Sequence, residues 1–153
     1  MQTIKNLKYD VERKTTNGRI ITFCTIHADL SYIFNELNKA HLTVLDINKG
    51  QFNLTCKLSR EAQIFAKCLA HLGFSYKYPT VVYVAKITLH EEDTDNRNLA
   101  RRIVMDKAHN ALVKQVADAL DAAMQPTRRK LYKLENIYDK LLDIGSNKFI
   151  NNF

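Results

Sequence analysis

The chain has 153 residues, of which 46% are apolar and 25% are charged, a composition typical of a folded protein and not of a disordered one. Its net charge of +7 favours an anionic partner, either nucleic acid or a protein with an acidic surface. We find neither an N-terminal signal pattern nor an apolar run of membrane-spanning length, so we expect a cytoplasmic protein with no membrane partner.

The cysteine and histidine patterns give no sign of a metal site. Cys24, Cys56 and Cys68 are odd in number, far apart and embedded in apolar patterns. Cysteines in such a pattern are usually small residues buried in the core, and they do not indicate a disulfide framework or a zinc site. No two histidines stand three to five residues apart. We therefore expect no bound metal and no cofactor.

The first predicted element is a β-hairpin over residues 8–28. Asn17-Gly18 separates two strand-like runs, and this dipeptide tolerates the positive φ angles of a tight turn. Counting outward from the turn places three pairs on one face, which should be the buried one: Tyr9 with Ile26, Val11 with Cys24, and Thr15 with Ile20.

The middle of the chain predicts a second unit of the same kind. After a helix over 28–42, with Asp29 or Ser31 as its cap, a second hairpin turns at residues 48–50. A helix over 59–74 follows, with Ser59 as N-cap and Gly73 at its C-terminal end, and then a strand over 80–91. A shift of 32 residues superimposes Cys24 on Cys56, so the two hairpin-helix units are candidates for a repeat. Together they predict an antiparallel sheet of about five strands with helices on one face.

The last third predicts a helical hairpin. One helix should run from about Asp95 to Met124, with Asp93, Thr94 or Asp95 as its cap, and Pro126 should end or kink it. A second helix, ended by Gly145, should fold back antiparallel. The predicted class is therefore α+β, with a hairpin-helix part over 1–92, a helical hairpin over 93–145 and a loose tail over 146–153, all in one structural unit.

Basic side chains in the helical part are the candidate binding residues. A count of about 100° per residue puts Arg101 on the apolar face of the first helix, where the shorter second helix would not cover it. Alternatively, Glu91, Glu92 and other nearby acids neutralise the arginines locally. A basic stripe on the second helix lies opposite its leucines and could follow a phosphate backbone. The candidate nucleic-acid-binding residues are Arg101, Arg102, Arg128, Arg129, Lys130, Lys133 and Lys140.

These features favour a small basic accessory protein that is not an enzyme and that contacts nucleic acid through a cationic helix face. One alternative is an inhibitor or regulator that binds an acidic protein surface, and another is an enzyme acting on nucleotides through His27 or His41. No catalytic motif supports the last, so no catalytic residue is assigned. The seam of the helical hairpin, with Tyr132 and Tyr138 near it, could also form a homodimer.

The segment ITLHEEDTDNRNLARRIVMDKAHNAL, residues 87–112, resembles a strand, acidic turn and basic helix of small bacteriophage accessory proteins. Asp93 matches the acid of the turn, and Lys107-Ala108 resembles an Arg-Ala pair in the helix. Asn98 stands where glycine is common in that pattern. The resemblance implies a viral protein in the host cytoplasm that regulates or counters host machinery, and it assigns no catalytic residue.

Overall fold

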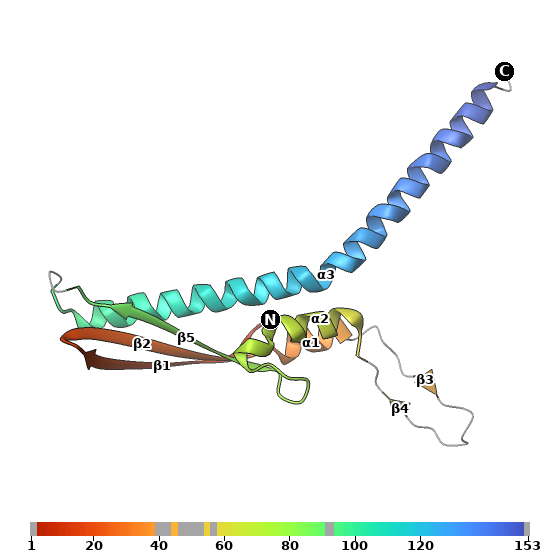
Figure 1. Ribbon diagram of the computed structural model, residues 1–153. Helices are drawn as coiled ribbons and strands as arrows, with labels where there is room; N and C mark the ends of the chain where they lie inside the picture. The colour runs from red at the N-terminus through yellow and green to blue at the C-terminus, as the bar shows by residue number, and fades with distance from the viewer. Residues whose placement is uncertain (1–2, 39–43, 46–53, 56–57, 91–93, 152–153) are drawn as a thin grey trace.

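The structure is a computed structural model that describes residues 3–38, 44–45, 54–55, 58–90 and 94–151, with side chains for all of these except 44–45, 54–55 and 145–151. A three-stranded sheet and two short helices lie under one face of a very long helix (Figure 1). Beyond the sheet, this helix turns away and projects from the rest of the molecule. The second half of the long helix is therefore an arm that projects from the compact part formed by the main sheet, the short helices and the first half of the long helix (Figure 1).

The sheet is antiparallel and has the strand order β1-β2-β5, formed by β1 (Lys5–Thr16), β2 (Arg19–Asp29) and β5 (Thr80–Thr88). Asn17 and Gly18 have φ angles of 53° and 75°, as the tight turn requires. The observed register confirms the three predicted pairs of the first hairpin. The predicted inner face is also confirmed, because Cys24 and Ile26 are fully buried.

Two short helices close one end of the sheet: α1 (Ser31–Asn38) and α2 (Arg60–Leu69), the latter continued by the 3-10 turn η2 (Ala70–Leu72). The side chain of Asp29 accepts a hydrogen bond from the amide of Ser31 at 2.8 Å. Ser59 caps α2 as expected, accepting from the amide of Ala62 at 3.0 Å. Gly73 ends η2 in the left-handed conformation, with φ 88°. The local capping signals of the sequence are thus realised.

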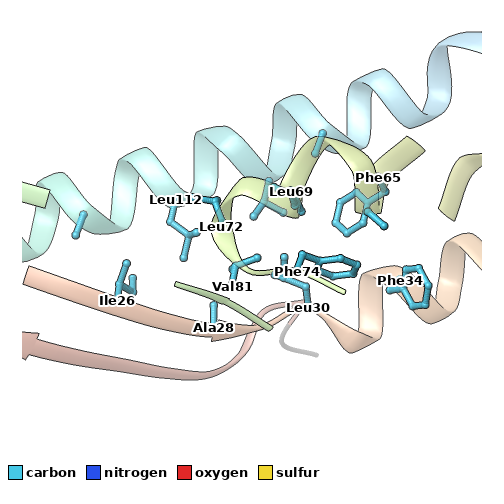
Figure 2. Packing of buried hydrophobic residues seen from close by; sticks show 14 of the residues in the cluster. Ile26, Ala28, Leu30, Phe34, Phe65, Leu69, Leu72, Phe74, Val81 and Leu112 are labelled. Carbon is cyan, nitrogen blue, oxygen red and sulfur yellow. The ribbon is translucent and has the colours of Figure 1, made fainter. Parts of the chain in front are cut away.

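The long helix α3 (Arg97–Asn151) supplies the other half of the core. Its first half lies over β2, β5 and α2 (Figure 1). Figure 2 shows Leu112 above Leu72, with Ile26 and Val81 on the sheet below. Small side chains let α3 approach its neighbours closely, and its buried face is formed by Val104, Ala108, Leu112, Val116, Ala119 and Ala123.

The expected sheet of about five strands is wrong. The main sheet has three strands, and β3 (Val44–Leu45) pairs with β4 (Leu54–Thr55) in a separate two-stranded sheet. The expected turn at residues 48–50 and Cys56 lie outside the described residues. Alternating apolar residues indicate a strand pair but not which sheet that pair joins, and this is why the two hairpins were placed in one sheet.

The expected helical hairpin is also wrong, because α3 is a single helix that continues through Pro126 and Gly145. Proline removes one backbone hydrogen bond and bends a helix without necessarily ending it. Figure 1 shows such a bend in the stretch of α3 that contains Pro126. The expected cap is corrected as well: Asn96, not Asp95, accepts from the amide of Leu99 at 3.1 Å, and Asp93 lies outside the described residues.

Candidate protein-interaction helix

No other described part of the chain covers residues 127–144 in the second half of α3, and these residues are called the distal helix. Every one of its residues is exposed. At about 1.5 Å per residue it is about 27 Å long. The main sheet, the short helices and residues 97–126 of α3 are together called the head. Side chains of the distal helix therefore face solvent along its whole described length.

A continuous apolar stripe runs along the distal helix. At about 100° per residue, seven apolar side chains fall within roughly 160° of its circumference. Each of them is between 53% and 63% exposed: Leu131, Leu134, Ile137, Tyr138, Leu141, Leu142 and Ile144. Single exposed apolar residues are ordinary, whereas a contiguous patch of this kind marks an interaction site.

The apolar stripe continues the buried face of the first half of α3. Ala119 and Ala123, which pack on the head, lie at nearly the same helical angle as Leu134 and Leu141. The stripe leaves the head at the bend, where the hydroxyl of Thr127 donates to Oε1 of Glu61 in α2 at 3.1 Å. The face that forms the core in the head is thus open to a partner in the distal helix.

Charges are segregated on the two sides of the stripe. The basic flank consists of Arg129, Lys133 and Lys140, and the acidic flank, on the other side, of Glu135 and Asp139. The far face, opposite the stripe, carries polar and aromatic side chains: Tyr132, Asn136 and Asp143. Both tyrosines were expected near the apolar seam. Tyr138 lies on the stripe, but Tyr132 lies on the far face, so the expectation for Tyr132 is wrong.

The structure divides the predicted nucleic-acid-binding residues between two places. The exposed Lys130, which by its helical angle falls within the stripe just before Leu131, lies on the distal helix together with the basic flank residues. Arg128 lies at its base, where its Nη1 donates to Oδ1 of Asp121 at 2.5 Å. The hydrogen bond from Arg128, with a smaller contribution from Gln125, holds the pKa of the Asp121 carboxyl below its ordinary value.

Arg101 and Arg102 lie near the other end of α3, about 40 Å along the helix from Arg129 at about 1.5 Å per residue. Both are exposed. They border a shallow depression that also contains Asp106, and the described residues form no ion pair with either arginine. Glu91 and Glu92, the expected acidic neighbours, lie outside the described residues. The predicted residues therefore do not form one continuous surface.

A cavity of about 370 Å³ lies between the sheet and the start of α3. At the wall of this cavity, Nη2 of Arg13 donates to Oδ1 of Asp95 at 2.7 Å, whereas the buried Nη1 of Arg13 has no hydrogen-bond partner among the described residues. The apolar walls include Leu99 and Ile103, which are about half exposed.

The histidine candidates for catalysis do not form a site. His27 lies on the uncovered face of the sheet, with its Nε2 3.7 Å from Oδ2 of Asp10; the His27 side chain is about half exposed and that of Asp10 is mostly exposed. His41 lies outside the described residues. Within the described ranges, no three histidine, cysteine or acidic side chains gather closely enough to hold a metal ion.

Leucines were expected on the face of a separate second helix opposite its basic stripe, with a neighbouring helix covering them. No described helix covers them, and Ile137, Leu142 and Ile144, which were not identified from the sequence, widen the stripe. In the part of the chain that the structure describes, no helix has the length and apolar character needed to cross a membrane. Comparisons of the chain with protein-family models, with curated proteins and with solved structures found no significant match.

Proposed function

We propose that this protein is a non-enzymatic binding protein that uses its distal helix to dock against a helix of a protein partner. The observation that carries the proposal is the apolar stripe of seven exposed side chains on a helix that projects from the head. An amphipathic helix that recognises a protein does so through such apolar anchors at helical spacing. The head then serves as the support that presents this helix.

The energetics of the distal helix support the same conclusion. Most helical stability in proteins comes from packing of an apolar face, and a single helix of this length is only marginally stable in water. Burying the exposed half of each stripe side chain contributes about 1 kcal/mol. Seven such side chains together contribute about 7 kcal/mol of favourable burial free energy. This is comparable with the free-energy cost of bringing two proteins together, which is about 4–15 kcal/mol. A partner that contributes its own apolar face therefore gives a stable complex.

Site-specific photo-crosslinking in the cells that produce the protein tests this proposal. A photoreactive amino acid replaces Leu134 or Leu141 in the stripe, and Tyr132 or Asn136 on the far face provides the matched control. We expect defined crosslinked products from the two stripe positions and little from the controls. Equal crosslinking from both faces, or none from the stripe, would show that the stripe is not a docking surface.

Nucleic acid is a second candidate partner, because the basic flank places three exposed cationic side chains along one edge of the distal helix. Each cationic side chain that neutralises a phosphate releases a counterion, and this supports sequence-independent binding. The acidic flank and the ion pair of Arg128 with Asp121 reduce the positive potential of the helix. The apolar stripe therefore remains the better supported binding surface.

A further inference from the structure

We infer that the partner of the distal helix is a second copy of this chain, and that the two distal helices pair in parallel. This inference rests on the proposed function, since it names the partner of the same stripe. It goes beyond that function because it specifies which helix covers the stripe and in which direction. Charge complementarity between the two flanks carries the argument.

The direction follows from the symmetry of a two-helix contact. In a parallel pair, the two-fold axis runs along the helices and brings one flank of the first helix against the opposite flank of the second. Here the basic flank of one copy, with Lys133 and Lys140, would face the acidic flank of the other, with Glu135 and Asp139. An antiparallel pair would instead place Lys133 and Lys140 beside the same two residues of the second copy. Charges on the flanks of paired helices decide orientation in this way.

The shape of the molecule leaves room for this arrangement. Figure 1 shows that α3 bends away from the sheet before the distal helix begins. The stripe lies on the same side of α3 that packs against the head in the first half of the helix. Beyond the bend, this side is exposed. Two copies joined along their distal helices would therefore form a stalk with both heads at the same end.

Disulfide trapping tests the direction in the full-length protein. Leu134→Cys and Leu141→Cys are made separately, in a background with Cys56→Ser and Cys68→Ser, and are oxidised with oxidised glutathione. In a parallel pair in register, both variants form a disulfide-linked dimer, because each residue lies next to its own copy. In an antiparallel pair whose helices cross near Leu134, the two copies of Leu141 are about 20 Å apart, which is far beyond disulfide reach. The same separation applies to Leu134 if the helices cross near Leu141. Asp143→Cys on the far face is the control and should stay monomeric on a non-reducing gel.

Charge exchange provides an independent test that needs no cysteine. Lys133→Glu with Lys140→Glu reverses two of the three charges of the basic flank, so that both flanks are net negative, whereas Glu135→Lys with Asp139→Lys makes both flanks positive. If the pair is parallel, each double variant alone associates about tenfold more weakly than the wild type. An equimolar mixture of the two regains wild-type association. Unchanged association of the doubly acidic variant would overturn the parallel arrangement, since antiparallel helices already place like charges together.

The outcomes separate this inference from the proposed function. Disulfides at both Leu134 and Leu141, together with recovery in the charge mixture, support a parallel pair of copies. Disulfides only in a mixture of Leu134→Cys with Leu141→Cys would overturn the parallel direction. Stripe-specific photo-crosslinks to a protein of another mass, with no disulfide in either variant, would overturn self-pairing and leave the proposed function standing. Absence of any stripe-specific product would overturn both.

Discussion

Ser59 is a buried polar side chain that joins α1 to α2. Its hydroxyl accepts from the amide of Ala62 at 3.0 Å and donates to the carbonyl oxygen of Leu37 at 2.8 Å. Its own amide donates to Oδ1 of Asn38 at 2.8 Å. One residue thus caps a helix and also satisfies the C-terminal end of the preceding helix, in a place that water does not reach.

We predict that Ser59→Ala lowers the free energy of unfolding by about 2 kcal/mol, because it removes a buried N-cap and leaves the part-buried carbonyl of Leu37 without its donor. Ser75→Ala is the matched control, since the Ser75 hydroxyl accepts from the amide of Tyr78 in an exposed turn. Urea unfolding of both variants measures the difference. Equal losses in the two variants would show that burial of Ser59 does not matter.

Tyr9 connects β1 to α3, with its hydroxyl oxygen 2.9 Å from Nδ1 of His109. Burial, with smaller contributions from Cys24 and Asp106, raises the pKa of Tyr9 above its ordinary value of 10.0. A raised pKa means that the folded state holds this proton more tightly than the unfolded state. The stability from Tyr9 is therefore complete below pH 10 and decreases as the pH rises through the folded-state pKa.

Tyr9→Phe should reduce this alkaline loss of stability. At pH 7 we expect the variant to be less stable by about 1 kcal/mol, because the hydrogen bond to His109 is lost. Between pH 9.5 and 11 its unfolding midpoint in urea should fall less steeply than that of the wild type. A pH dependence identical to that of the wild type would exclude Tyr9 as the titrating group.

At the scale of elements, the sequence correctly predicted the turns and helix ends that depend on only a few neighbouring residues. Asn17-Gly18 determined the register of the first hairpin, and Ser59 and Gly73 marked the two ends of the α2–η2 segment. These signals act within a few residues, so they do not depend on the rest of the fold. The strand pair β3–β4 was assigned to the wrong sheet because no local signal states which neighbour a strand will have.

The distal helix was misplaced because Pro126 was interpreted as an interruption. A signal for continuity was present in the sequence: Ala119 and Ala123 before the proline are in phase with Leu134 and Leu141 after it. Two independent helices have no need to keep this phase. The same signal indicates that the apolar face extends beyond the head, and it could have identified the stripe as a site.

The basic flank of the distal helix makes a separate prediction about nucleic acid. If it contacts phosphates, substitution of Arg129, Lys133 and Lys140 by alanine should reduce the slope of log affinity against log salt by about 2–3 on a DNA duplex. The control with the same loss of charge substitutes Lys67, Lys77 and Lys86 of the head by alanine. Fluorescence anisotropy at several salt concentrations measures both. Equal slopes in the wild type and the distal variant would exclude this flank as a nucleic-acid interface.

At the scale of the whole molecule, one helix has two roles. Its first half completes the core, with Val104, Ala108 and Leu112 fully buried, and its second half presents the same face to a partner. Stability of the head and association through the stripe are therefore separable. Substitutions between residues 129 and 144 should leave the unfolding of the head nearly unchanged, since all of these residues are exposed.

Sedimentation equilibrium over a range of protein concentrations tests most directly whether the stripe pairs two copies. We expect the mass of the wild type to rise from 17.7 kDa towards twice that value at micromolar concentrations. Leu134→Asp with Leu141→Asp should remain at 17.7 kDa, whereas Tyr132→Asp with Asn136→Asp, which adds the same charge on the far face, should associate like the wild type. A wild type that stays monomeric at all concentrations, or a dimer that persists in the stripe variant, would contradict the account.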